Sequence, residues 1–228
     1  MSKTAIIIPA RLEAKRLPNK PLKLINNKEM ILHVYESASA SNSGEVFVAT
    51  PNQKIIDVVR DFGGKAIKTS ENHKTGTDRV FEVFEKNLNS EPNIIVNLQG
   101  DMPNIENKAI SKLIEHMKKN QCDIGTLASN FSSKNEIDNP NIVKVEVKEK
   151  LNDSKFLNAL DFFRNNKVSK NILYHHIGIY GFTRRALMMY VKLNRSKLEL
   201  ERKLEQLRAL ENNMSIHVGF VESCPLSV

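Results

Sequence analysis

Four cationic residues near the start of the chain have the chemistry needed to bind phosphate groups. Arg11, Lys15, Arg16 and Lys20 fall within ten residues, directly after the apolar run 5–8. An arginine can donate two parallel hydrogen bonds to phosphate oxygens, and a lysine acts as a point charge. The sequence contains neither GxGxxG nor GxxxxGKS/T, so phosphates would be held by these side chains. A solvated loop is the alternative, but the position directly after a strand favours a phosphate site.

A second motif supplies a carboxylate. Gln99, Gly100 and Asp101 directly follow the apolar run 93–98. Mg²⁺ in proteins usually takes one or two carboxylates together with substrate phosphates. A loop aspartate alone is more often a helix cap or a turn residue. Together with the basic loop, Asp101 indicates a site for a magnesium-bound polyphosphate.

Three other polar segments carry weaker signals. The segment 75–79 (TGTDR) precedes a helical pattern, and Thr75 could simply be its N-cap. His175 and His176 resemble a metal pair, but adjacent strand residues point to opposite faces and cannot chelate one ion. The segment 205–208 is most simply the charged surface of a helix.

The elements that must position these motifs alternate between strand and helix. Buried strands are predicted at 5–8, 45–50, 65–68, 93–98 and 123–128, and helices at 30–40, 52–62, 79–84 and 105–117. This alternation is typical of a doubly wound α/β fold with a mostly parallel sheet. In such sheets ligands bind beyond the carboxyl ends of the strands, where both motifs lie.

The pattern changes after Ser132. Further strands are predicted at 142–147, 172–182 and 215–221, and helices at 184–193 and 198–210. With no internal repeat or linker, we interpret residues 1–228 as one α/β domain with a smaller antiparallel excursion over the open edge of its sheet.

Composition excludes several classes of protein. The 228 residues are 40% hydrophobic and 26% charged, as in ordinary globular chains. The net charge is +8, but acidic residues are interspersed among the basic ones almost everywhere. No DNA-binding motif occurs, so we expect no nucleic-acid partner. No apolar run reaches the ~18 residues of a membrane span. The apolar stretch at the N-terminus is too short for a signal-peptide core, so we expect a cytoplasmic protein and interpret Cys122 and Cys224 as reduced thiols.

Six motifs follow one another along nearly the whole chain. They are IIIPAR…RLPNKPL (6–22), GGK (63–65), TGTDR (75–79), IVNLQGDMP (95–103), HIGIYGF (176–182) and LEQLR (204–208). In this order they resemble the 3-deoxy-manno-octulosonate (KDO) cytidylyltransferases, or CMP-KDO synthetases. The resemblance implies a nucleotide-diphospho-sugar transferase fold. It also implies Mg²⁺-dependent synthesis of CMP-KDO from CTP and KDO for lipopolysaccharide, by a homodimer.

The resemblance also implies roles for particular residues. Arg11, Arg16 and Lys20 would hold the triphosphate, and Asp101 would bind Mg²⁺, with Arg11, Lys20 and Asp101 as the catalytic group. Thr77 and Arg79 would meet the cytosine. The residues that would line the sugar pocket are Gln99, Arg164, His176, Tyr180, Glu205 and Gln206. The anomeric hydroxyl of the sugar would attack the α-phosphorus in line, without a covalent enzyme intermediate.

The sequence departs from the family pattern at several positions. Lys15 stands where the family often has Ser or Thr, Asn19 replaces a glycine, and Met102 replaces the glutamate of QGDEP. Phe163 replaces the serine of FSR. The family pattern continues past Val228 with a second metal-binding aspartate and a final helix, so we expect this sequence to lack both.

Three other functions remain open from sequence. The sugar could be a related acid sugar, such as 8-amino-KDO or a sialic-like sugar. The protein could bind CTP without turnover, or it could be a basic RNA-binding protein.

Overall fold

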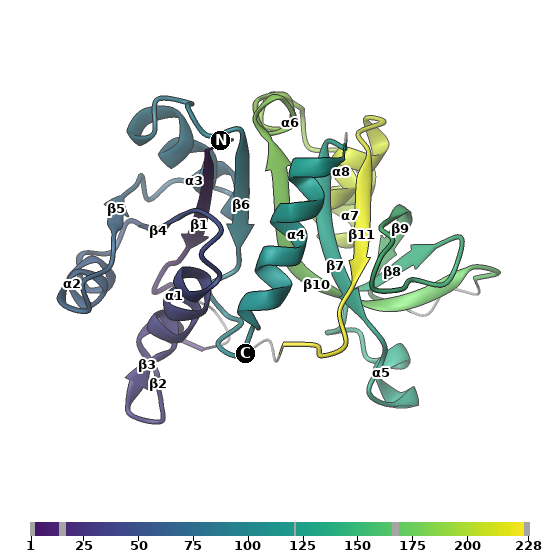
Figure 1. Cartoon of the computed structure of the whole chain (residues 1–228), viewed down its shortest axis with the longest axis horizontal. Helices are drawn as coiled ribbons and strands as arrows, with labels where there is room; N and C mark the ends of the chain where they lie inside the picture. Colours follow the sequence, from purple (N-terminus) through teal and green to yellow (C-terminus); the bar gives the residue numbers. More distant parts are fainter. Residues whose placement is uncertain (1–2, 14–16, 121, 166–168, 226–228) are drawn as a thin grey trace.

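The computed structural model describes residues 3–13, 17–120, 122–165 and 169–225. Over these residues a nine-stranded mixed sheet runs through the molecule, and a separate two-stranded hairpin lies beside it (Figure 1). The strands of the large sheet are β1 (Thr4–Pro9), β4 (Glu45–Thr50), β5 (Ala66–Lys68), β6 (Ile94–Leu98), β7 (Ile124–Ser129), β8 (Lys144–Val147), β9 (Leu157–Phe163), β10 (Ile172–Thr183) and β11 (Ile216–Phe220). The hairpin consists of β2 (Leu24–Ile25) and β3 (Lys28–Glu29).

Helices connect most of these strands. They are α1 (Met30–Ala40), α2 (Gln53–Asp61), α3 (Gly76–Glu82), α4 (Asn107–Lys119), α5 (Lys134–Asp138), α6 (Arg184–Tyr190), α7 (Lys197–Arg202) and α8 (Gln206–Glu211). A short 3₁₀ turn, η1 (Lys20–Leu22), follows the first loop, and a π-helical turn, η2 (Val83–Asn87), extends α3.

The first half of the sheet is parallel, as its apolar runs predict. Strand β1 lies between β4 and β6, with Ile6 level with Val46 on one side and Val96 on the other. Ile6, Ile7 and Ile8 are each fully buried, because helices cover both faces. Helices cover the two faces of these strands, which confirms the prediction of an α/β fold.

The second half corrects the prediction of a mostly parallel sheet. The long strand β10 does not extend an edge but lies between β6 and β7, antiparallel to both, so the sheet order is β5-β4-β1-β6-β10-β7-β11-β9-β8. Helix α4 packs closely against β10 at Gly181, where a Cβ atom would lie 3.0 Å from Met117 Cγ. Any larger residue at position 181 would require the Met117 side chain to shift by a few tenths of an ångström.

Strand pairings also close on themselves at this end of the molecule. Strand β10 pairs with β7 and β8, β7 with β11, β11 with β9, and β9 with β8. The five strands therefore form a closed circuit. Strand β9 was not expected from the sequence, because Asn158 and Asp161 interrupt its apolar pattern.

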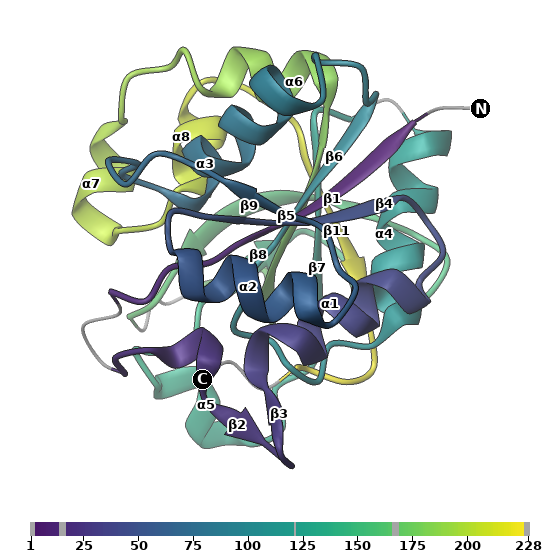
Figure 2. The same cartoon turned by 90° about the vertical axis from the view of Figure 1, so that its left-hand side faces the viewer.

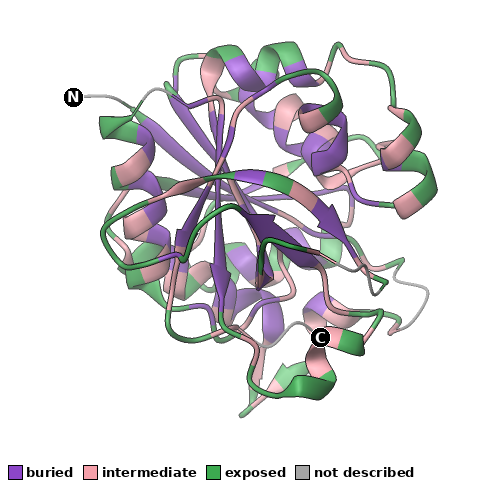
Figure 3. Cartoon of the chain, turned by 90° about the vertical axis from the view of Figure 1, so that its right-hand side faces the viewer, coloured by how far each residue is buried: buried purple, intermediate pink, exposed green. Residues whose placement is uncertain are grey.

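The helices divide the core into two clusters on either side of the sheet (Figure 2). One cluster packs β1 and β6 under α1, α2 and α4, and the other packs them under α3, α6 and α8. Viewed from the end with the closed circuit, buried residues follow the strands and the inner helix faces, and exposed residues cover the outside (Figure 3).

The helix predicted at 198–210 is wrong in one respect. It is two short helices, α7 and α8, because Lys203 adopts a left-handed backbone conformation with φ of 57° and ends α7.

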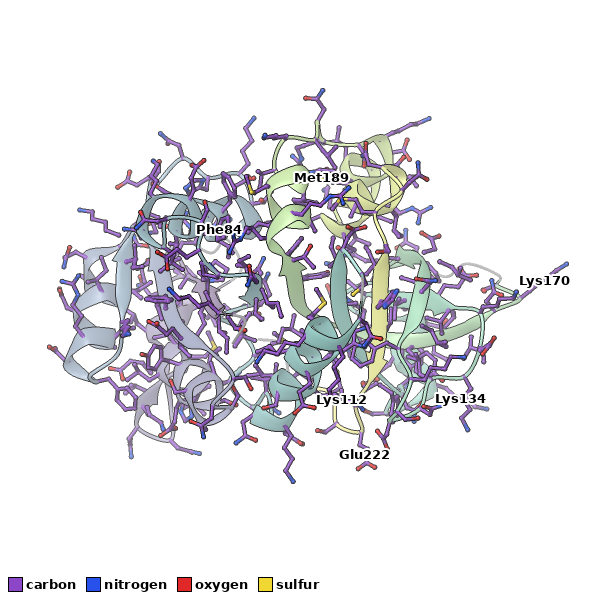
Figure 4. All side chains as sticks on the ribbon, turned by 45° about the horizontal axis from the view of Figure 1, so that its top comes forward. Phe84, Lys112, Lys134, Lys170, Met189 and Glu222 are labelled. Atoms are coloured by element: carbon purple, nitrogen blue, oxygen red, sulfur yellow. The ribbon has the colours of Figure 1, made fainter. Side chains whose placement is uncertain are left out.

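Charged side chains such as Lys134, Lys170 and Glu222 extend outward, whereas Phe84 lies inside (Figure 4). Among the described helices, none has the length and apolar character needed to cross a bilayer.

Candidate active site

A cavity of about 340 Å³ opens at the carboxyl ends of β1 and β6. Six predicted site residues line it, and they come from widely separated parts of the chain: Arg11, Lys20, Arg79, Gln99, Asp101 and Glu205. Strand ends β1 and β6 supply Arg11 and Asp101, η1 supplies Lys20, α3 supplies Arg79, and Glu205 directly precedes α8. The cavity lies at the end of the parallel strands where the sequence predicts ligand binding.

The basic loop and the strand-end carboxylate meet in this cavity. Lys20 Nζ donates a hydrogen bond to Asp101 Oδ2 at 2.8 Å, across 81 residues of sequence. Arg11 is exposed at the end of β1 and lines the same cavity. Two cationic groups and one carboxylate are thus available to a phosphorylated ligand.

Two of the family departures have a local explanation. Asn19 precedes η1 with φ of 57°, a left-handed conformation that asparagine tolerates better than most residues other than glycine. Met102 is 3% exposed and packs in the apolar cluster with α1 and α4, where it contributes no charge to the cavity. Lys15 and the predicted phosphate ligand Arg16 lie outside the described residues.

A buried polar chain joins α3 to the segment before α8. Thr77 Oγ1 donates to Glu205 Oε2 at 2.8 Å and accepts from Asn97 Nδ2 at 3.2 Å. Burial raises the pKa of the Glu205 carboxyl, and the hydrogen bond from Thr77 opposes that rise. Tyr190 Oη donates to the Glu205 carbonyl at 2.9 Å, which fixes the backbone at this position. Asn97 was not singled out from sequence, because an asparagine within a buried apolar strand gives no motif.

Arg79 lies at the inner wall of the cavity and is 3% exposed. Its Nη1 donates to Ser70 O at 2.8 Å and to Thr69 Oγ1, so it holds the loop that leads into α3. Burial lowers the pKa of Arg79, and the positive charge of Arg11 adds to this effect. The helix itself begins at a capping box in which Thr75 Oγ1 accepts from the Asp78 N–H and Asp78 accepts from the Thr75 N–H. The N-cap interpretation of Thr75 is therefore confirmed.

Sequence reasoning missed a hydrogen-bonded pair, His73 and Glu82, which lies beside the same loop. Their Nε2 and Oε2 atoms are 2.6 Å apart, and the Ser70 N–H donates to the same carboxylate at 2.9 Å. Burial alone would raise the pKa of Glu82, but hydrogen bonds from His73, Ser70 and Lys86 lower it to about 2. His73 lines the cavity, and nine residues separate it from Glu82, a spacing that no common motif uses.

The other predicted sugar residues extend away from the cavity along β10. His176 is buried, and its Nε2 lies 2.9 Å from Thr126 Oγ1. Burial lowers the pKa of His176 to about 3, so its ring is neutral at physiological pH. The Tyr180 ring centroid lies 5.4 Å from that of His176, and burial followed by the charge of Glu205 raises the pKa of Tyr180. The Gln99 side chain lies 3.5 Å from the position of a Cβ on Gly178 and so connects β10 to the cavity.

Arg164 and Gln206 complete the predicted set without lining the 340 Å³ cavity. Arg164 follows β9, and its Nη1 donates to the Asn141 carbonyl at 2.8 Å. That carbonyl belongs to a turn also held by the buried Lys144, whose Nζ donates to Asn139 O at 2.6 Å and to Arg164 O at 2.6 Å. Gln206 is 7% exposed at the first position of α8, directly after Glu205.

Comparison with known proteins agrees with this geometry. The family model described as Cytidylyltransferase matches residues 5–216. The 3-deoxy-manno-octulosonate cytidylyltransferase of Thermodesulfovibrio yellowstonii is 44% identical over 230 residues, covering 96% of this chain and 90% of the relative.

Solved structures extend the likeness to three dimensions. A CMP:2-keto-3-deoxy-manno-octonic acid synthetase complexed with CTP superposes with a TM-score of 0.89 at 36% identity, covering 100% of this chain and 93% of that one. A UTP-bound UGPase from Acinetobacter baumannii has a TM-score of 0.70 at 11% identity, covering 100% and 88%, and is similar in fold alone.

Proposed function

This chain belongs to the cytidylyltransferase family, and from that premise we propose that it transfers a cytidylyl group from CTP to KDO, giving CMP-KDO and pyrophosphate. The observation that carries the proposal is the meeting of Arg11, Lys20 and Asp101 at one end of the parallel strands. A triphosphate needs cations to offset its charge, and this end of the cavity provides them.

In the proposed reaction, the anomeric hydroxyl oxygen of KDO forms a bond to the α-phosphorus as the bond from that phosphorus to the pyrophosphate oxygen breaks. The hydroxyl proton leaves to solvent, and pyrophosphate carries away the electron pair of the broken bond. Arg11 and Lys20 offset the charge that collects on the leaving pyrophosphate. Catalysis then consists of positioning and charge stabilisation.

The donor set of the cavity fits a magnesium ion. Asp101 offers a carboxylate oxygen, a hard ligand, at the strand end beside Lys20. Mg²⁺ sites in nucleotide enzymes commonly take one or two carboxylates and complete their coordination with phosphate oxygens and water. We propose that Asp101 holds Mg²⁺, which would neutralise phosphate charge when bound.

We propose that the nucleotide base lies near Thr77 and Arg79, and that the sugar extends from Glu205 toward β10. The polar chain from Asn97 through Thr77 to Glu205 supports this arrangement, because it places a residue of the proposed base site beside a residue of the proposed sugar site. Gln99, His176, Tyr180 and Gln206 would face the sugar hydroxyls, and Arg164 would meet its carboxylate.

The decisive experiment measures pyrophosphate release from CTP and Mg²⁺ with and without KDO. We expect release that requires KDO and yields CMP-KDO by mass spectrometry. Release with 8-amino-KDO or a sialic acid but not with KDO would move the assignment to a related acid sugar. CTP binding by calorimetry without release in the presence of any of these sugars would contradict turnover.

The Asp101→Asn variant tests the metal position. We expect Mg²⁺-dependent turnover to fall by about 100-fold or more, since one charged ligand is lost. The fold should persist, because the Asp101 side chain is 34% exposed. Asp153→Asn is the matched control, since Asp153 is a 73% exposed partner of Lys112 outside the cavity. Unchanged turnover in Asp101→Asn would remove this residue from the metal site.

We also propose that the enzyme acts in the cytoplasm as a homodimer. Exposed apolar side chains support an interface, among them Met188 and Met189 on α6 and Leu200 on α7. Sedimentation equilibrium of wild type and Met189→Lys tests it, with a monomeric wild type as the contradicting result.

A further inference from the structure

Three side chains that bind borderline and soft metal ions meet far from the cavity. His116 lies in the last turn of α4, Cys122 precedes β7, and His217 lies near the start of β11. Strand β7 runs in the same direction as β1, because β10 is antiparallel to both β6 and β7. The cluster therefore lies at the starting ends of the strands, opposite the end that holds the cavity (Figure 1).

The ligand atoms are close to the spacing of a tetrahedral metal site. His116 Nε2 and His217 Nδ1 are 3.0 Å apart, and these atoms and Cys122 Sγ all lie within 4.8 Å of one another. Around a tetrahedral zinc ion, two imidazole nitrogens lie about 3.3 Å apart, and a nitrogen and a thiolate sulfur about 3.6 Å. Shifts of about 1 Å, within reach of side-chain rotation, would bring all three atoms to these separations.

The surrounding residues hold the His116 ring in place. It stacks on Phe156, with centroids 3.6 Å apart and planes 5° apart. Its Nδ1 lies 3.0 Å from the Asn120 side-chain amide. The same Asn120 Nδ2 donates to the His116 carbonyl at 3.0 Å, so the amide fixes the ring to the end of α4. Metal-binding histidines commonly have a hydrogen-bond partner on the second ring nitrogen.

The sulfur side of the cluster is buried. Cys122 is 5% exposed, and its Sγ lies 3.4 Å from Met117 Sδ. Two imidazoles and a thiolate favour zinc-class transition metals, whereas Mg²⁺ prefers oxygen ligands. We propose that His116, Cys122 and His217 form a zinc-class site, with water in the fourth position.

Such a site would add a link between α4, which packs against the sheet, and the strands β7 and β11, which already pair with each other in the sheet. The hydrogen bond between the two rings would break, and its hydrogen would move through solvent to the other nitrogen of the ring that donates it. Binding would then form one bond from the metal to each of the two imidazole nitrogens and one to Cys122 Sγ, and the thiol proton would leave to solvent. The metal would tie the end of α4 to the starting ends of β7 and β11. Because this is opposite the catalytic end, the proposal stands or falls independently of the cytidylyl transfer.

The test is a titration of the full-length, metal-free protein with Co²⁺, a spectroscopic probe for zinc sites. We expect a near-ultraviolet thiolate-to-cobalt charge-transfer band that saturates at one ion per chain and disappears when Zn²⁺ is added. Zn²⁺ should also raise Tm by about 5–10 °C at a free concentration about 100-fold above its Kd.

Variants decide which residues bind. Cys122→Ser should abolish the band, and Cys224→Ser, the matched control, should retain it. His217→Gln replaces a half-buried ring and should weaken Co²⁺ binding by at least about tenfold, with circular dichroism confirming the fold. Absence of the band in wild type, or its loss in Cys224→Ser but not in Cys122→Ser, would overturn the proposal.

Discussion

At the scale of single residues, charged side chains of the candidate site already have hydrogen-bond partners within the protein. The Arg164 guanidinium donates to a backbone carbonyl of the 139–142 turn, and the buried Lys144 holds the same turn from inside. These bonds order Arg164 without a substrate, which would reduce the entropy lost on binding an acidic sugar in the proposed role.

Replacing Arg164 tests its assignment to the sugar carboxylate. We expect Arg164→Ala to raise the KM for KDO by about 10- to 100-fold, the loss of a hydrogen bond to a charged group, with a much smaller change for CTP. Steady-state kinetics with each substrate varied in turn measures this. Arg185→Ala, an exposed arginine on α6, is the control, and an equal effect on both substrates would refute the assignment.

Glu82 predicts an acid-dependent contribution to stability. Its folded-state pKa of about 2 lies below the ordinary 4.5, so its stabilisation is fully present above pH 4.5 and is lost as pH falls toward 2. We expect Glu82→Gln to cost about 2–3 kcal/mol at pH 7. Denaturant unfolding between pH 7 and pH 2.5 should show the difference from wild type shrinking as pH falls. Glu85→Gln, an exposed neighbour, should show no such convergence.

At the scale of elements, the capping box of α3 positions two predicted base-binding residues. Thr75 and Asp78 satisfy each other's backbone N–H groups, and Thr77 and Arg79 lie in the turn that follows. We expect Thr75→Ala to cost about 1 kcal/mol, a fall in Tm of about 2–4 °C, and to raise the KM for CTP. Ser133→Ala at the start of α5 is the control, because its side chain caps no backbone group. A Tm loss in both variants alike would argue against the cap.

Element prediction succeeded where local chemistry decides the structure. The run 5–8 is continuously apolar, and 45–50 and 93–98 are mostly apolar, so their burial on both faces could be predicted from sequence. The insertion of β10 does not, because it depends on pairings with β6 and β7, whose residues lie about 50 to 90 positions away. The break at Lys203 is equally hidden, since Leu204, Leu207 and Leu210 continue a helical stripe past the left-handed residue.

Prediction of the site was limited in the same way, by contacts between residues far apart in the sequence. Arg11, Lys20 and Asp101 were found because they directly follow strands. The hydrogen bond between Thr77 and Glu205 spans 128 residues. Before the structure, only the family resemblance assigned both residues to one active site. Asn97 and the His73–Glu82 pair have no local pattern and required coordinates.

At the scale of the whole molecule, the net charge of +8 accompanies a cavity lined by cations, where we propose that the CTP triphosphate binds. Arg11 is exposed, so salt should screen its attraction for CTP. We expect the KM for CTP to rise about three- to tenfold from roughly 0.05 to 0.5 M KCl, with a smaller change in kcat. Initial rates across this range provide the measurement. A KM for CTP that does not change with salt concentration would mean that the nucleotide is bound mainly by buried groups.

The closed circuit of strands has a consequence for how the protein behaves in concentrated solution. Exposed strand edges can template pairing with other chains and so start aggregation. Strand β8 is paired on both sides, so within the described part of the large sheet β5 forms the remaining edge. That edge is three residues long, ends in Lys68 and follows Lys65. Because this edge is short and positively charged, it is a poor template for strand pairing. The large sheet is thereby kept from pairing with the sheets of neighbouring molecules.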